Sequence, residues 1–175
     1  MEENIESTPV STRSVGLMYG VYAALISSAV FLLTSLLGYN PFGGGLNYIG
    51  TVASIVLLVL AHKKFKESGD GYMSFGQGFG IGFWFTLIST VIAVLVMYVY
   101  ITFIDANPLQ MMLDENTAKM QESGQSDDQV QVAIEWTKKL FWPIAAIGAI
   151  FFGLVIALVV TIFTQKKNPQ GDFNN

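Results

Sequence analysis

Three long windows without a charged side chain limit what this sequence can fold into. Residues 14–61, 71–104 and 140–165 contain no Asp, Glu, Lys or Arg over 48, 34 and 26 positions. A helix needs about 20 residues to cross a hydrocarbon core of about 30 Å. The first window therefore predicts two membrane-spanning helices, and each of the others predicts one. Helices are expected because a backbone in lipid must satisfy its own amide and carbonyl groups.

The composition agrees with this class of protein. Hydrophobic residues make up 52% of the 175 positions and charged residues only 13%, about half of the roughly 25% typical of soluble domains. We therefore expect an all-α, polytopic membrane protein and exclude a soluble globular domain. The sequence contains no cysteine, which excludes disulfides and Cys-ligated metal. The net charge of −4, without a basic stripe, disfavours nucleic acid as a partner.

Breaker residues and charges bound a single transmembrane domain, residues 15–167. Its four spans are expected at about 15–37, 46–62, 75–104 and 140–164. A polar tail precedes the domain at residues 1–14, and another follows it at 168–175. The second span is short for a full crossing, so we expect it to tilt toward the interface. The first span lacks the basic leader and exit site of a cleaved signal peptide, which favours a retained helix.

The polar segment 105–139 is expected to form a helical hairpin between the third and fourth spans. Ser126 and Gln129 have the spacing of a capping box, as Ser74 and Gln77 do at the start of the third span. Such pairs begin helices. Gly124 separates the two arms of the hairpin. Disorder is the alternative, because the apolar content of the segment is modest.

Each arm of this hairpin has an apolar stripe, and we regard the two stripes as a candidate partner surface. They consist of Leu109, Met112, Leu113 and Met120 on the first arm and Val130 and Ile134 on the second. The stripes can pack on each other, on the bilayer surface or on another protein. Methionine is common at adaptable binding surfaces, and the net charge of −4 of this segment disfavours adsorption to an anionic leaflet. Besides the lipid bilayer, a second copy of the chain or another membrane protein is therefore the expected partner.

Lysine and arginine are unevenly distributed between the two sides. The N-terminal tail, the loop after the second span and the residues that follow the fourth span contain six of them, and the opposite side contains three: Arg13, Lys63, Lys64, Lys66, Lys166 and Lys167 against Lys119, Lys138 and Lys139. Cytoplasmic loops are enriched in these residues. This bias predicts cytoplasmic termini and an extracytoplasmic hairpin.

One segment resembles a known family. The sequence KKFKESGDGYMSFGQGFGIGFW at residues 63–84 combines a basic loop, a Gly-Tyr-x-Ser-Phe-Gly-Gln entry and a glycine-rich helix start. With the long polar loop before the last span, it resembles the four-span membrane proteins of Bacteroidota called domain of unknown function 4199. The resemblance implies a bacterial inner-membrane location. It supplies no catalytic residues, because that family has no established activity.

Small residues recur every four positions in three of the spans. Such stripes let helix backbones approach closely in lipid. We expect helix packing at Gly16, Gly20, Gly76, Gly78, Gly80, Gly82, Ala149 and Gly153. In the third span, the pairs 76/80 and 78/82 lie on nearly opposite faces, since two helical residues turn about 200°. The contacts are expected within one subunit, with a homo-oligomer as the alternative.

The spans lack the side chains that most enzymes require. They contain no carboxylate, and His62 at the end of the second span is the single histidine. No general acid–base pair can therefore be assembled in the membrane, and we expect no enzyme activity, no cofactor and no metal. One histidine cannot form a typical metal site. A structural position at the interface is expected for His62, with a proton relay as the weaker alternative.

Two function classes remain open from the sequence. A structural or interaction protein of the membrane fits the small-residue stripes and the amphipathic hairpin. The alternative is a small channel or carrier for a neutral or weakly polar solute, since hydroxyl-lined paths need no charge. A polar cavity lined by Ser54, Thr86 or Ser89 would favour the second class, and a dry bundle the first.

Overall fold

The computed structural model describes residues 10–43 and 45–168 and contains five helices over these residues. They are α1 (Thr12–Leu36), α2 (Asn47–Glu67), α3 (Phe75–Phe103), α4 (Asn107–Glu122) and α5 (Asp127–Thr164). Four of them, α1, α2, α3 and α5, are long and apolar enough to cross a membrane. The predicted all-helical class with four long apolar helices is thereby confirmed. The expected tails at 1–9 and 169–175 lie outside the described residues.

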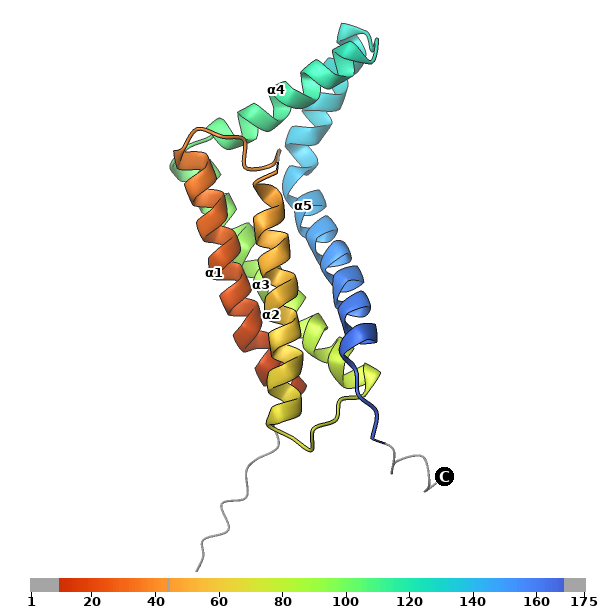
Figure 1. Ribbon diagram of the computed structural model, residues 1–175. Helices are drawn as coiled ribbons and strands as arrows, with labels where there is room; N and C mark the ends of the chain where they lie inside the picture. Colours follow the sequence, from red (N-terminus) through yellow and green to blue (C-terminus); the bar gives the residue numbers. More distant parts are fainter. Residues whose placement is uncertain (1–9, 44, 169–175) are drawn as a thin grey trace, which may run out of the picture.

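The four long helices stand side by side, and α4 crosses one end of them (Figure 1). We call this end the α4 end. At the opposite end, the terminal end, α1 begins and α5 finishes (Figure 1). An antiparallel backbone pair closes the terminal end, because Met73 and Lys166 exchange N–H···O bonds of 2.8 and 2.9 Å. This pair fastens the α2–α3 loop to the segment that follows α5.

Local sequence signals account for where the helices begin and end. Both predicted capping boxes are present, Ser74 with Gln77 and Ser126 with Gln129. Gly124 has a φ of +79° at the turn before α5, a conformation that favours glycine. The expected shortness of the second span is not observed. Instead, α2 continues to Glu67, with Lys64 and Lys66 in its last turn, where cations complement the helix dipole.

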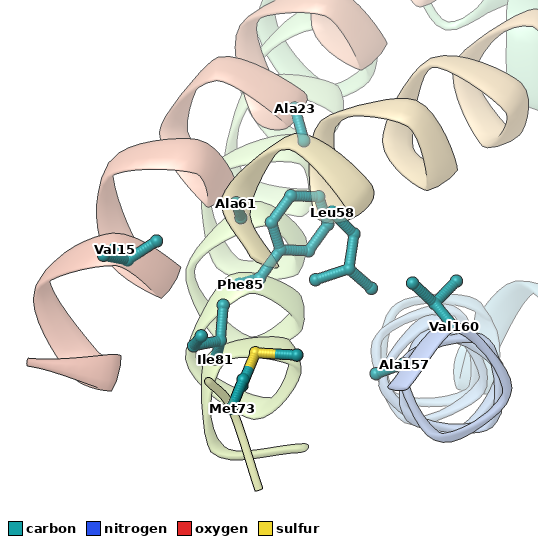
Figure 2. Packing of buried hydrophobic residues seen from close by; sticks show 9 residues of the cluster. All are labelled: Val15, Ala23, Leu58, Ala61, Met73, Ile81, Phe85, Ala157 and Val160. Atoms are coloured by element: carbon teal, nitrogen blue, oxygen red, sulfur yellow. The ribbon is translucent and has the colours of Figure 1, made fainter. Parts of the chain in front are cut away.

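The interior is divided into two apolar clusters at different levels of the bundle. The larger one contains Val15, Ala23, Leu58, Ala61, Met73, Ile81, Phe85, Ala157 and Val160. Figure 2 shows their side chains converging between the four long helices. The smaller cluster, at the α4 end, contains Phe31, Tyr100 and Ile101, with Phe42 and Trp142 packed against it. A hollow remains between the two clusters.

Candidate functional site

The hollow between the two clusters is a cavity of about 370 Å³ in the half of the bundle nearer the α4 end. This volume is within the usual range for small-molecule sites. All four long helices contribute to its wall. Eight of the lining residues have hydroxyl groups: Ser27, Ser28, Thr34, Thr51, Ser54, Thr86, Ser89 and Thr90.

The hydroxyl groups differ in whether they already have partners. Thr34, Ser54 and Ser89 donate back to carbonyl oxygens of their own helices at 2.7, 2.8 and 3.1 Å. Ser28 is only 8% exposed, and its Oγ has no hydrogen-bond partner in the described part of the chain. A buried polar atom without a partner costs free energy. Ser28 is a lining residue of the cavity, and its unpartnered Oγ, with less than 1 Å² of accessible surface, lies just beneath the cavity wall.

Residues of both apolar clusters line the two ends of the cavity, and exposed residues line its side. Leu58 and Phe85 of the larger cluster form its floor, and Phe31 and Phe42 of the smaller cluster lie at its other end. Three lining residues are also exposed on the outside of the bundle, Thr51 on α2 and Ala149 and Phe152 on α5. The exposed part of the wall therefore belongs to α2 and α5.

The helix contacts explain why the cavity lies beside α2. The backbones of α1 and α3 approach each other closely, whereas α2 has no equivalent contact. A Cβ on Gly16 would lie 2.6 Å from the Ile81 carbonyl oxygen, and a Cβ on Gly20 would lie 2.7 Å from that of Phe85. These glycines let α1 contact the backbone of α3. A Cβ on Gly50 of α2 would meet Ser27 Oγ only at 3.6 Å, an ordinary contact. The sheltered space between α2 and its neighbours is the cavity.

The remaining small residues proposed for helix packing have different surroundings. A Cβ on Gly82 or Gly153 would lie 2.5 Å from Ala157 or Thr86 across the α3–α5 interface, and one on Gly78 would lie 2.7 Å from Thr161. Ala149 lines the cavity. Gly76 has no atom within 4 Å of such a Cβ, and Gly80 has only Thr12, at 3.7 Å. The 78/82 face of α3 is therefore tightly packed, whereas the 76/80 face has room for a side chain.

His62 occupies the centre of the terminal end and is fully buried. Its Nε2 lies 3.0 Å from the Gly78 carbonyl oxygen and its Nδ1 2.6 Å from Thr164 Oγ1. Because a carbonyl only accepts, Nε2 carries a hydrogen. The single hydrogen of the Thr164 hydroxyl is directed to the Val160 carbonyl oxygen at 2.8 Å, so Thr164 Oγ1 stands between that oxygen and Nδ1. Lys66 Nζ donates to the Thr164 carbonyl oxygen at 2.8 Å. His62 thus joins α2 to both α3 and α5, partners that the sequence did not identify.

At the α4 end, one polar contact holds the α1–α2 loop in place. Asn40 donates to Glu115 of α4 at 2.7 Å and accepts from the Phe42 amide at 2.9 Å. Lys119 also donates to Glu115, at 2.6 Å. Hydrogen bonds from Lys119 and from Asn40 lower the pKa of the Glu115 carboxyl, because both stabilise its charged form. The contact positions Phe42 at the end of the cavity.

This pKa shift predicts a pH-dependent contribution of Glu115 to stability. A carboxyl whose pKa is lower in the folded state stabilises the fold above its unfolded pKa of about 4, and this contribution is lost as the pH falls through the folded value. Wild type should therefore unfold at a higher temperature than Glu115→Gln at pH 7, and the difference should vanish on acidification below pH ~4. Thermal unfolding across a pH series measures this. Glu122→Gln, on the same helix, is the control, and identical pH profiles for the two variants would contradict the prediction.

The residues proposed as a partner surface are mostly engaged within the chain. Leu113 and Val130 are buried, with exposed fractions of 3% and 5%. Leu109, Met112, Met120 and Ile134 are half-buried, and Leu109 packs on the smaller cluster. A partner that contacts this hairpin stays a prediction.

No group of three or more His, Cys, Asp or Glu residues able to hold a metal ion occurs within residues 10–43 and 45–168. The cavity wall contains hydroxyl, aromatic and aliphatic groups. It can donate and accept hydrogen bonds to an uncharged molecule. It has no carboxylate or imidazole with which to transfer a proton.

Four long apolar helices surround an uncharged, hydroxyl-lined cavity, and their length and composition are compatible with a multi-pass membrane protein. The chain belongs to the family described as Protein of unknown function (DUF4199), whose model matches residues 18–166. The predicted family is thereby confirmed, whereas an origin in the Bacteroidota stays a prediction. No curated protein and no solved structure matches the chain significantly.

Proposed function

We propose that this protein binds a neutral, weakly polar molecule in the cavity between α1, α2, α3 and α5. The observation that supports this most directly is Ser28, a buried hydroxyl on the cavity wall without a partner of its own. A rotation of the Ser28 side chain would bring this hydroxyl to a bound molecule with a hydroxyl or carbonyl group. Such a site belongs to the carrier class that the sequence left as the alternative to a structural role.

The chemistry of the wall limits the ligand to an uncharged one. Among the described lining residues there is no Asp, Glu, Lys, Arg or His. An ion at this depth would be costly without a charged partner. Because residues of the two apolar clusters line both ends of the cavity, we favour a bound ligand over conduction through an open pore. The same lack of acid–base groups supports a function without catalysis.

The interaction role predicted first from the sequence is less favoured by the packing. Gly16, Gly20, Gly82 and Gly153 make their close contacts within the chain, and Leu113 and Val130 are buried in it. Most of the small-residue stripes and of the hairpin stripes is therefore already in contact with the chain itself, and little of their surface is free to contact a partner. A homo-oligomer and a second membrane protein stay predictions.

We place the protein in a bacterial inner membrane with both termini in the cytoplasm. The six-to-three bias of lysine and arginine supports this, and the start of α1, the α2–α3 loop and the end of α5 lie at the same end of the bundle (Figure 1). Since the sequence has no cysteine, single cysteines can report the orientation. A membrane-impermeant maleimide should label Ser123→Cys but not Ser68→Cys in intact spheroplasts, and the opposite pattern would reverse the assignment.

A photoreactive neutral probe tests the ligand site directly. A diazirine-bearing benzyl alcohol, added to the full chain in nanodiscs, should label cavity peptides saturably, and its benzoic acid counterpart should not. Ser28→Ala should weaken binding roughly fivefold, the equivalent of one hydrogen bond of about 1 kcal/mol. Ser54→Leu should abolish labelling by filling the cavity. Ala29→Leu, at an exposed position of α1, is the matched control and should label as wild type. The site would be refuted if neither Ser28→Ala nor Ser54→Leu changed the labelling.

A further inference from the structure

A short turn in the α1–α2 loop, residues 40–43, forms part of the cavity wall at the α4 end. Pro41 and Phe42 both line the cavity. The turn is closed by two hydrogen bonds, from the Gly43 amide to the Asn40 carbonyl oxygen at 3.3 Å and from the Phe42 amide to the Asn40 side chain at 2.9 Å. Pro41 is buried, whereas Phe42 is half-buried. The Phe42 ring therefore reaches from the cavity wall to the surface of the α4 end.

Two side chains of a projecting arm contact this turn from outside. The arm consists of α4 and residues 127–142 of α5, and its tip extends beyond the four-helix bundle (Figure 1). Asn40 donates to Glu115 of α4 at 2.7 Å, and a Cβ on Gly43 would lie 2.8 Å from the same carboxylate oxygen. The Phe42 ring packs edge-on against Phe141 of α5, with the ring centroids 5.5 Å apart. The arm therefore holds the turn through both of its helices.

The arm joins the rest of the bundle at two places where the chain can bend. One is the link 104–106 between α3 and α4. The other is Pro143 inside α5. Proline has no N–H to donate to the carbonyl oxygen of Lys139, four positions earlier, and helix kinks concentrate at such positions. A bend at these two places carries Glu115 away from the turn while α1, α2 and α3 stay in place.

We propose that the arm is a clamp on the cavity. It holds Phe42 at the cavity end through Glu115 and Phe141, and bending at Pro143 releases the turn and opens the cavity at the α4 end. This inference rests on the proposed function and adds how access to the same site is controlled. The path that opens starts in water rather than among acyl chains, because the charged side chains of Glu115 and Lys119 are exposed on the arm beside the turn.

The test measures how fast a thiol inside the cavity reacts with a water-soluble reagent. Thr90→Cys, at a lining position that is 8% exposed, gives the full chain its single cysteine. In nanodiscs, the reagent is a sulfonate-bearing methanethiosulfonate, which does not cross lipid. Asn40→Ala should speed the reaction roughly fivefold through the lost hydrogen bond, and Phe42→Ala should speed it further. Pro143→Ala should slow it, because the restored backbone hydrogen bond stiffens the arm.

Gln121→Ala, at an exposed position of α4, is the matched control and should react as the parent chain does. Thermal unfolding of each variant confirms that it is folded. The clamp is overturned if Asn40→Ala and Phe42→Ala react at the parent rate, or if Pro143→Ala does not slow the reaction. If the benzyl alcohol probe still labels the cavity saturably in that case, the ligand site stands without the clamp. If that labelling is absent while the rates change as expected, the clamp is supported and the proposed ligand site fails.

Discussion

Gly16→Leu is expected to lower the free energy of unfolding by roughly 3 kcal/mol, the upper part of the usual range for overpacking. A Cβ at this position would lie 2.6 Å from the Ile81 carbonyl oxygen and 2.8 Å from Trp84 Cβ. A backbone oxygen cannot rotate away, so α1 and α3 would have to separate along the most extensive helix contact in the bundle. Detergent-solubilised protein, unfolded by heat or by a denaturing detergent, provides the measurement.

The matched control is Gly76→Leu, which introduces the same side chain in the first turn of α3. A Cβ there meets no atom within 4 Å, and the residue is exposed. Its effect should stay within about 0.5 kcal/mol, as for most surface substitutions. Equal losses of stability in the two variants would show that close approach at Gly16 is not what holds α1 to α3.

His62→Ala is expected to destabilise the terminal end by about 4 kcal/mol, because a buried side chain and two hydrogen bonds are lost together. His62 contacts Gly78 of α3 and Thr164 of α5, so the variant disconnects α2 from both. Amide exchange should accelerate at Met73 and Lys166, whose backbone pair closes the same end. Lys64→Ala, an exposed position on the same helix, should change neither stability nor exchange.

A milder variant keeps this prediction testable if His62→Ala does not fold. Thr164→Val removes only the hydroxyl that faces His62 Nδ1 and should cost about 1 kcal/mol. The double variant Thr164→Val with His62→Ala should then be little worse than His62→Ala alone, since both remove the same hydrogen bond. Strictly additive losses would mean that the two side chains do not interact.

Local and compositional properties of this chain could be predicted because each depends on residues close together in the sequence. A capping box needs only Ser74 and Gln77, three positions apart. Gly124 ends the run before α5 through its own φ of +79°. The length of α2 was underestimated, because hydropathy reports where charges begin rather than where the helix stops.

For the candidate site, the sequence predicted some of the hydroxyl residues but not their arrangement in space. Ser54, Thr86 and Ser89 were expected to line a cavity if one existed, and all three do. Thr51 was missed, although it precedes Ser54 by three positions and shares its helix face. The unpartnered state of Ser28 was beyond sequence reasoning, because Ser35 on the same helix does bond back, at 2.8 Å, to its own backbone.

The sequence by itself determined the all-helical class with four long apolar helices, since long uncharged windows in a chain of this length predict membrane-spanning helices. The tertiary structure decided which glycine faces are packed, which hydroxyl lacks a partner, and that His62 meets a residue 102 positions away. In lipid, an apolar side chain gains little free energy by contacting another helix instead of an acyl chain. Hydropathy therefore does not determine which face of a helix packs against its neighbours. Close approach at Gly16, Gly20 and Gly82 selects them, and the cavity lies where α2 lacks an equivalent contact.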